Sequence, residues 1–337
     1  MKKSFTAIAT IVAALAMGIS RAPAQDSSWA TLVAAAKKEG QVTLYSTQLG
    51  QPYQDDIIKL FEAKYGIRVQ LVALRTNEIR ERIRADQAAG QAGADISYNG
   101  STTSELQMAE GRFQPFGALQ ALGALRSDFQ SDGTLLPVSI QGYGILVNTR
   151  LVKPEEEPKS WQDLLDPKWK GRILSADQRE LGDGGVLFYT SYQAFGREFQ
   201  DKLAGQVVLS RELRENERRT ARGEFPLYIP FGMPNLPPLK GLPVKGVIPA
   251  EGMPYIVYVM AMLRDAAHPN AARLLMDFFI EHDAAMIYAK GGFRVPVDVP
   301  LDQLDSYARS VTSAKLMGTT DVKKINAVLA IAKEIYK

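Results

Sequence analysis

The sequence has 337 residues, of which 46% are hydrophobic and 23% are charged. This composition supplies ample material for an apolar core and does not fit a disordered, collagenous or coiled-coil protein, and at about 150 residues per domain the length predicts roughly two domains. Cysteine is absent and histidine occurs twice, which excludes disulfides, thiolate metal sites and cysteine nucleophiles and leaves little material for a histidine-rich metal site.

The first 24 residues have the pattern of a cleaved secretory signal peptide. Lys2 and Lys3 precede an apolar run over 5–19, and the small residues at 22–24 suit a signal peptidase. The run is shorter than the about 20 residues that a membrane span needs. Three of the 40 basic residues lie in this segment, which leaves 37 against 37 acidic ones. We therefore expect a periplasmic protein with no net charge after cleavage and no nucleic-acid partner.

Residues 28–98 repeat one sequence pattern, in which a helical segment ends in glycine and a short run rich in β-branched residues follows. Glycine suits the left-handed turn that ends a helix, and β-branched residues favour strands. The pattern predicts helices over 28–39, 52–64 and 76–90 and strands over 42–45, 67–72 and 94–98. This βαβαβ alternation predicts a parallel sheet covered by helices.

The alternation weakens over 112–145 and then resumes in a second α/β section. The predicted strands are 144–148, 171–175 and 254–263, and the predicted helices begin at Ser160, Gly185, Glu198 and Pro269, with a further segment over 221–229 that passes from helix into strand. A loop-like stretch covers 230–252, and a final amphipathic helix covers 321–337.

The fold class that follows is α/β with two lobes, each a mixed sheet flanked by helices, joined by hinge strands. We expect one lobe to comprise 25–125 with 252–305, and the other 126–251 with 306–337. Ligands of open α/β sheets sit beyond the carboxyl ends of the strands, so two facing sheets would form a cleft that a hinge could close around a solute.

Several ordered segments resemble a known family. They are V-T-L-Y-S at 42–46, F-E-A-K-Y-G-I-R-V at 61–69, A-D-I at 94–96, G-Y-G-I-L-V-N at 142–148, K-S-W-Q-D-L at 159–164, W-K-G-R-I at 169–173, G-E-F-P at 223–226 and H-P-N-A-A at 268–272. Together they are similar to type II periplasmic solute-binding proteins of ABC importers, in the branch (extracellular solute-binding protein family 1) that holds ferric-iron, phosphonate, thiamine and polyamine binders. The resemblance implies two lobes, a hinge, capture of a solute and delivery to an inner-membrane permease.

The iron-binding members of that family usually supply two adjacent tyrosines after the segment that matches 223–226, and many place a histidine after the first strand. Here the corresponding segments read L-Y-I-P-F-G at 227–232 and S-T-Q-L-G at 46–50. One tyrosine and no histidine in these loops make a ferric-iron cage harder to build, so no metal ligands are assigned.

Two loops offer polar groups at strand ends. The first holds Ser46, Thr47 and Gln48, and the second holds Asn99, Gly100 and Ser101. Hydroxyls, amides and the backbone N–H groups of a helix start can bind a polar solute, although the same residues are equally suited to simple helix capping.

The sharpest local feature is D-Q-R-E-L-G-D-G-G at 177–185, between a strand and a helix. We predict solute contacts from Asp177, Arg179, Gly182, Asp183 and Gly184. Arginine can clamp a carboxylate or phosphonate through two hydrogen bonds, and glycine lets the backbone approach a ligand. The alternative is a tight turn with a surface Arg–Asp pair.

Tyr143, Tyr228 and Tyr255 lie near the predicted crossings between lobes, where they would contact the solute or pack the hinge. The segment 212–222 alternates arginine with glutamate and predicts mainly a solvated helix face, with one arginine able to reach the cleft.

The leading hypothesis is therefore a non-enzymatic periplasmic receptor for a small organic anion, acting as a monomer without a cofactor. Ferric iron is the alternative ligand. A secreted hydrolase is a third reading, disfavoured because the sequence lacks a G-x-S-x-G elbow, an H-E-x-x-H motif and a thiol.

Overall fold

The structure is a computed structural model that describes residues 24–48 and 52–337. The predicted signal peptide lies, except for Ala24, outside these residues. Among the described helices, none combines the length and the apolar character that a membrane crossing requires.

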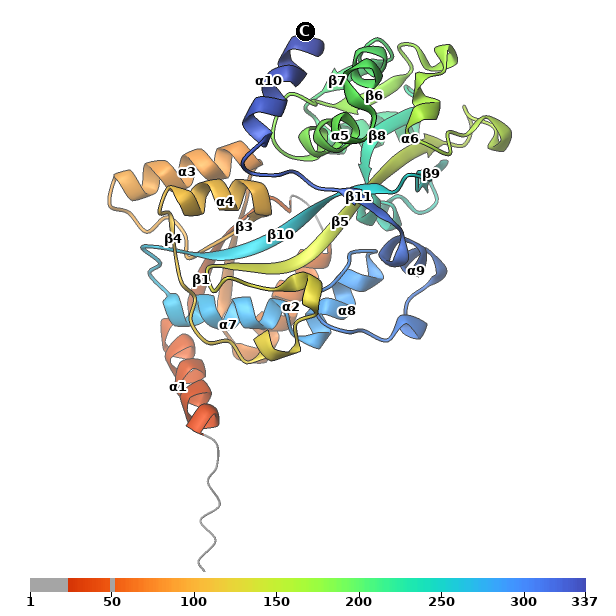
Figure 1. Cartoon of the computed structure of the whole chain (residues 1–337). Helices are drawn as coiled ribbons and strands as arrows, with labels where there is room; N and C mark the ends of the chain where they lie inside the picture. The colour runs from red at the N-terminus through yellow and green to blue at the C-terminus, as the bar shows by residue number, and fades with distance from the viewer. Residues whose placement is uncertain (1–23, 49–51) are drawn as a thin grey trace, which may run out of the picture.

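The first part of the chain forms the predicted βαβαβ unit (Figure 1). Its elements are α1 (Ala24–Glu39), β1 (Gln41–Ser46), α2 (Pro52–Tyr65), β2 (Arg68–Ala73), α3 (Thr76–Ala88), β3 (Ile96–Gly100) and α4 (Ser101–Ala109). Strand β1 pairs in parallel with β2 and with β3. The parallel sheet expected here is confirmed, and Gly40 ends α1 with a positive φ of 71°.

Two long antiparallel strands join the halves of the molecule: β5 (Leu135–Asn148) and β10 (Met253–Leu263). In Figure 1 they run side by side from the lower sheet to the upper one. The short strands β4 (Phe113–Gln114) and β11 (Leu316–Gly318) pair with β10. The main strand order is β2-β1-β3-β10-β5-β8-β6-β7.

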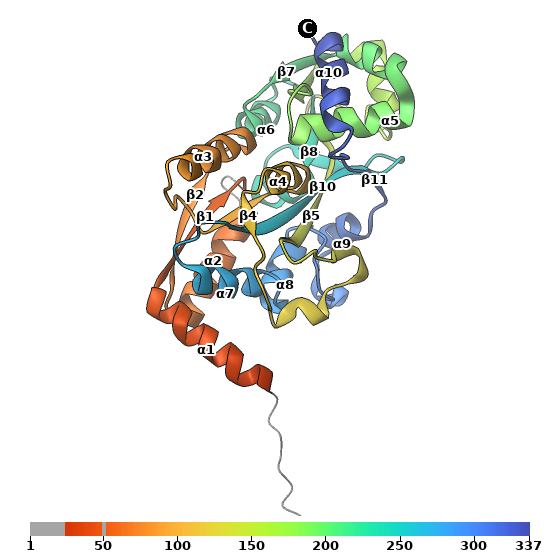
Figure 2. The same ribbon diagram turned by 60° about the vertical axis from the view of Figure 1, so that its left-hand side comes forward.

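The second half contains the other end of β5 and a second parallel unit. Its strands are β6 (Ile173–Ala176), β7 (Val207–Ser210), β8 (Leu227–Gly232) and β9 (Val244–Val247), and its helices are α5 (Asp183–Ala204), α6 (Leu213–Arg222) and α10 (Ile325–Ile335). Strand β6 pairs in parallel with β7 and β8. Figure 2 shows α10 against α5, at the end of the molecule opposite α1.

Each half has its own hydrophobic core. The first core joins β1 and β3 to α7 (Pro269–Phe279) and α8 (His282–Lys290), with Phe61, Tyr98 and Phe279 fully buried. The second surrounds Trp161 and Ile173. Helix α9 (Ser306–Ser313) contributes Ala308 to the first core and Val311 to a cluster that contains Leu146. The residues predicted to divide the lobes stay a prediction.

The two predicted helices over 185–195 and 198–203 are both present within α5, where a kink at Gly196, whose φ of 76° and ψ of −173° are not helical, separates them. One element prediction needs correction. The weakly patterned stretch before residue 144 is the first part of β5. Pro137 is tolerated there because it lies at a register shift in the pairing with β10, where a missing N–H breaks no regular ladder bond.

Candidate solute-binding cleft

A cavity of about 460 Å³ lies between the two halves and is lined by residues of both. Its walls contain the segments that follow β1 and β3 in the first half and those that follow β6 and β7 in the second. These are the carboxyl ends of parallel strands, where ligands of open α/β sheets bind. The volume suits a small-molecule ligand.

The first-half wall contains both polar loops predicted from the sequence. Thr47, Gln48, Asn99, Gly100 and Ser101 line the cavity. Gly100 precedes α4 without a side-chain cap, and the first turn of a helix has backbone N–H groups that lack partners within the helix. The helix start is therefore suited to an anionic group of a ligand.

The Asn99 amide strengthens this interpretation. The side chain is 1% exposed, and its Nδ2 has no hydrogen-bond partner within the described chain, while its Oδ1 accepts from the Gly100 backbone N–H at 2.8 Å. A buried donor without a partner is unfavourable until an acceptor reaches it.

The second-half wall contains the loop from Asp177 to Gly184. Asp177, Gly182, Asp183 and Gly184 line the cavity. Gly182 has a φ of 111°, which other residues rarely adopt, and a Cβ on Gly184 would lie 2.1 Å from the Asp177 carbonyl oxygen. These glycines therefore shape the loop itself. Asp183 opens α5, so its own carboxyl already occupies the positive end of this helix.

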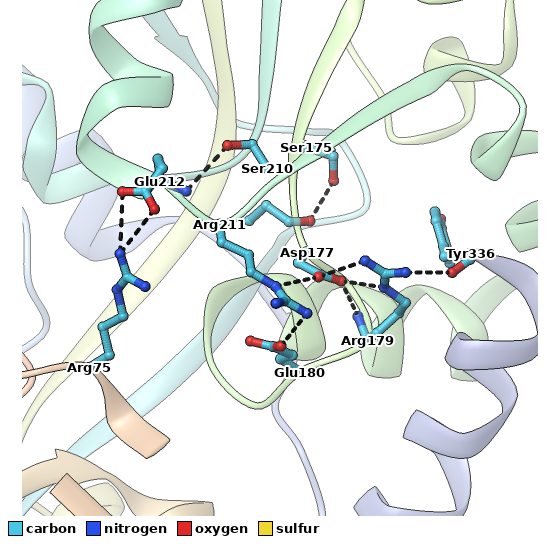
Figure 3. A network of polar contacts seen from close by, with 10 residues as sticks. Arg75, Ser175, Asp177, Arg179, Glu180, Ser210, Arg211, Glu212 and Tyr336 are labelled. Atoms are coloured by element: carbon cyan, nitrogen blue, oxygen red, sulfur yellow. Dashed lines mark hydrogen bonds and ion pairs between the residues drawn. The ribbon is translucent and has the colours of Figure 1, made fainter. Parts of the chain in front are cut away.

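Arg179 does not line the cavity, in contrast to the solute contact predicted for it. Figure 3 shows that it forms instead the Arg–Asp pair that was the alternative for this loop. Its Nε and Nη2 donate to the two oxygens of Asp177 at 2.8 and 2.9 Å, and its Nη1 donates to the Tyr336 carbonyl at 3.1 Å. Arg211 also donates to Asp177, at 3.1 Å. Burial raises the pKa of Asp177, but the bonds from both arginines outweigh it and lower this pKa to about 2.

Ser46, Tyr143, Tyr228 and Tyr255 are also absent from the cavity wall. Ser46 is buried and donates to Gln54, Tyr228 is 2% exposed, and Tyr143 is fully buried below Asp183. Tyr255 lies on β10 opposite Gly142 of β5. Because side chains alternate across a strand and Ile256 lines the cavity, Tyr255 lies on the other face.

Sequence reasoning missed several lining residues. Gln141 belongs to β5 and Tyr258 to β10. Arg75 precedes α3, and Arg214 and Glu217 belong to α6. Gln141 could have been found from the sequence, because a glutamine within the largely apolar segment of β5 indicates a polar position in a buried strand. Helix α6 was predicted to be mainly solvated, but three of its charged side chains line the cavity: Arg214, Glu215 and Glu217.

The deepest polar contacts surround Asp183. Tyr143 donates to Asp183 Oδ1 at 2.9 Å, and the hydroxyls of Tyr143 and Tyr258 lie 3.4 Å apart. Burial raises the pKa of Asp183 to about 6, against the opposing effects of the Tyr143 hydrogen bond and the Arg214 charge. Burial also raises the pKa of Glu217, which accepts from Arg214 at 3.2 Å and from Asn235 at 2.5 Å.

One ion pair connects the two halves at the cavity edge (Figure 3). Arg75 Nη2 donates to both oxygens of Glu212, at 3.0 and 3.2 Å. Arg75 precedes α3 in the first half and Glu212 precedes α6 in the second. Both side chains are more than half exposed.

Among the described residues, no group of three or more histidine, cysteine, aspartate or glutamate side chains is arranged to hold a metal ion. The cavity wall combines polar and charged side chains with apolar ones such as Leu181 and Ile256, and it contains the starts of α4, α5 and α6, which have no side-chain cap.

Comparison with solved structures identifies the architecture. The substrate binding protein of the ABC transporter from Agrobacterium tumefaciens superimposes with a TM-score of 0.77 at 16% identity, over 88% of this chain and 94% of that one. A periplasmic thiamin binding protein gives 0.74 at 17% identity, over 88% and 96%. The ferric binding protein from Campylobacter jejuni gives 0.70 at 18% identity, over 88% and 98%. The fold is that of the two-lobed type II periplasmic binding proteins, as predicted.

The family model described as bacterial extracellular solute-binding protein matches residues 97–312. The chain belongs to this family, which confirms the resemblance found in its sequence.

Three curated relatives also match the sequence. An uncharacterized protein of Haemophilus influenzae is 26% identical over 256 residues, covering 69% of this chain and 71% of the relative. Iron uptake protein A1 of Synechocystis is 29% identical over 143 residues, or 41% and 38% of the two chains. A putative 2-aminoethylphosphonate-binding periplasmic protein of Salmonella typhimurium is 22% identical over 224 residues, or 59% and 65%. The last two alignments span less than two thirds of those relatives.

Proposed function

We propose that this protein captures a small organic anion in the cleft between its halves and delivers it to the permease of an ABC importer. The family and the two-lobed fold support capture of a solute. A relative named as periplasmic and the signal-like first 24 residues support action in the periplasm.

The observation that carries the anion proposal is the α4 start. Its uncapped backbone N–H groups, the unpartnered Asn99 Nδ2 and the nearby Ser101 side chain all belong to the cavity wall. These groups are hydrogen-bond donors, and a carboxylate or phosphonate offers the acceptors that would complete them. Arg179, whose guanidinium is bound to Asp177, adds nothing to this proposal.

Calorimetry with a solute panel tests the proposal. The panel contains short carboxylates and alkylphosphonates, with glucose and potassium chloride as comparisons. We expect at least one organic anion to bind with one-to-one stoichiometry and to raise the melting temperature. Exchanging Asn99 for Ala should weaken that binding by about tenfold, since a hydrogen bond to a charged group is lost. Binding of neutral sugars alone, or of simple cations alone, would contradict the proposal.

Ferric iron is a second candidate, because an iron uptake protein and a ferric binding protein are among the similar proteins and Tyr143 contacts the cavity-lining Asp183. The geometry supports it less well, since Tyr143 and Tyr228 do not line the cavity. Iron bound by tyrosinate is coloured. A visible absorption band that develops with ferric citrate would favour iron over an organic anion.

We also propose that the chain catalyses no reaction, because its family and its structural neighbours are binding proteins. Turnover of simple ester, peptide or glycoside substrates by the purified protein would contradict this.

A further inference from the structure

The cavity wall carries more carboxyl groups than guanidinium groups. Its charged side chains are Glu78, Asp177, Glu180, Asp183, Glu212, Glu215 and Glu217 against Arg75, Arg211 and Arg214. Several of these are paired near the edge, including Arg75 with Glu212 and Arg211 with Glu180. An anion alone does not account for this excess of negative groups, because like charges in a partly enclosed space repel.

Outside the floor of the cavity most of the carboxyls are paired, including Asp177 with Arg179 and Arg211, and Glu215 with Arg222. At the floor, where the halves meet, two carboxyls share one guanidinium group. We define the floor cluster as Gln48, Gln141, Tyr143, Asp183, Glu217 and Tyr258. The Asp183 carboxyl is close enough to Glu217 to raise the pKa of Glu217 further. Arg214, which acts on both residues, supplies one positive charge against two carboxyl groups. If both carboxyls ionise, the floor has a net negative charge.

A second observation points to a donor-bearing ligand. The Oε1 atoms of Gln48 and Gln141 are buried hydrogen-bond acceptors without a partner in the described chain, and the two side chains are 4% and 3% exposed. Both residues line the same cavity. A side-chain hydrogen bond with Gln48 opposes the rise in the pKa of Tyr258. The Tyr258 hydroxyl lies within hydrogen-bond distance of the Tyr143 hydroxyl, which donates to Asp183. Unpartnered buried acceptors are unfavourable until N–H or O–H donors reach them.

We propose that the floor cluster is a subsite for a primary ammonium group, which Asp183 binds as the counter-ion and the two glutamine oxygens bind as acceptors. An ammonium group offers three donors and one positive charge, and this matches the acceptors and the charge of the floor. The proposal rests on the proposed function and deepens it. The captured solute is an amino-bearing organic anion, with its acidic end at α4 and its ammonium end at Asp183.

The tyrosines make the floor less suitable for a ferric ion. Burial and the neighbouring Asp183 carboxyl raise the pKa of Tyr143 and that of Tyr258 above the ordinary value. Burial and the Asp183 charge act in the same way on the pKa of Tyr228. Phenolates are therefore disfavoured, whereas neutral hydroxyls that orient Asp183 remain available to an ammonium ligand.

The subsite predicts a pH dependence. The groups that face Asp183 are Tyr143 of β5, Tyr258 of β10, Tyr228 of β8, and Arg214 and Glu217 of α6. Burial raises the pKa of Asp183 to about 6 in the empty cleft. An ammonium group favours the ionised carboxyl and lowers this pKa, so binding releases protons near pH 6, and affinity falls as the pH is lowered through 6.

Matched ligand pairs test the inference by calorimetry. The pairs are 2-aminoethylphosphonate with ethylphosphonate, 3-aminopropanoate with propanoate, and 4-aminobutanoate with butanoate. We expect the amino member of at least one pair to bind at least tenfold more tightly at pH 7.5. The advantage should shrink between pH 7 and pH 5. Titrations in buffers of different ionisation enthalpy should report proton release near pH 6.

Variants locate the effect. Asp183→Asn should reduce affinity for the amino ligand by about tenfold to a hundredfold and should abolish its pH dependence near 6. Affinity for the desamino anion should not fall, because no ammonium contact is lost and a negative charge is removed. Glu180→Gln is the matched control, because this cavity-lining carboxyl is paired with Arg211 outside the floor cluster. It should leave the amino preference intact. Circular dichroism checks that both variants fold.

The outcomes separate the two proposals. Desamino anions that bind as tightly as their amino partners would overturn the ammonium subsite and leave anion capture standing. An amino preference that survives Asp183→Asn would overturn the assignment to the floor. Tight binding of ferric citrate, with a tyrosinate absorption band, would overturn it in favour of a metal cation. Simple amines that bind without an acidic group would support the subsite and contradict the anion proposal.

Discussion

Two aspartates of one loop have opposite environments. Asp177 accepts hydrogen bonds from Arg179 and Arg211, which outweigh its burial and lower its pKa to about 2. Asp183 has no comparable set of guanidinium donors among the bonds described for it, and burial raises its pKa to about 6. Ionised Asp177 therefore stabilises the fold, whereas ionised Asp183 opposes it and is available for a ligand.

Asp177→Asn should destabilise the protein by about 2 kcal/mol at pH 7, the value of a shift of nearly two pKa units. The native pKa is depressed, so the stabilisation is present above about pH 4 and disappears as the pH falls toward 2. Urea unfolding of both proteins between pH 3 and pH 7 measures this. Asp56→Asn, on the exposed face of α2, is the control. A difference that is the same at pH 3 and pH 7 would contradict the prediction.

Local sequence predicted the residues whose position follows from a strand end. Thr47, Gln48 and Asn99 follow or end parallel strands, and the cavity lies at those ends. Arg179 forms the local Arg–Asp pair that was the alternative for its loop, through two bonds to Asp177. Its third bond, to the Tyr336 carbonyl 157 residues away, could not be read from any local pattern. Gln141 was missed because its strand was expected to begin only at residue 144.

The N-terminal ends of α3, in the first half, and α6, in the second half, face each other across the cavity edge. The Arg75–Glu212 pair joins them across the cavity edge. Exposed pairs of this kind contribute about 0.2–1 kcal/mol, which is enough to change the ratio of closed to open molecules by a few-fold at most.

Arg75→Ala should therefore shift the empty protein toward open conformations by up to about five-fold. The backbone bond from Arg75 to Glu78 does not depend on the lost side chain, so α3 keeps this cap. Spin labels at the exposed Lys59 and Lys170, introduced as cysteines into a chain that has none, measure the distance between halves. Arg84→Ala, which removes an exposed pair within α3, should leave the distances unchanged. Equal distances in all three proteins would contradict the prediction.

The elements were predicted well where periodicity agreed with a glycine before a strand, as for β1 and β2, or with a proline at a helix start, as for α7. The first part of β5 was predicted poorly, because Pro137 lies within this strand at a register shift. Tertiary pairing decides this case, because β10 supplies the partner that keeps β5 extended.

At the scale of the whole molecule, two cores are joined by the crossing strands β5 and β10. This arrangement allows one half to rotate against the other while each core remains intact. A solute that contacts both walls would then favour the closed arrangement.

A bound solute should therefore compact and stabilise the protein. At a concentration of one hundred times its dissociation constant it should add about 2.7 kcal/mol to the free energy of unfolding, and the radius of gyration measured by X-ray scattering should decrease. A member of the panel that shows no binding in calorimetry serves as the control. Stabilisation without any change in scattering would mean that the cleft does not close on binding.

The hydrogen bond from Arg179 to the Tyr336 carbonyl has a practical consequence. It ties the residue that follows α10 to the loop that forms one wall of the cleft, although Tyr336 itself does not line the cavity. A purification tag fused directly behind Tyr336 would pull on that loop and could alter measured affinities. Binding experiments are better served by a tag joined at the start of α1, at the opposite end of the molecule (Figure 2).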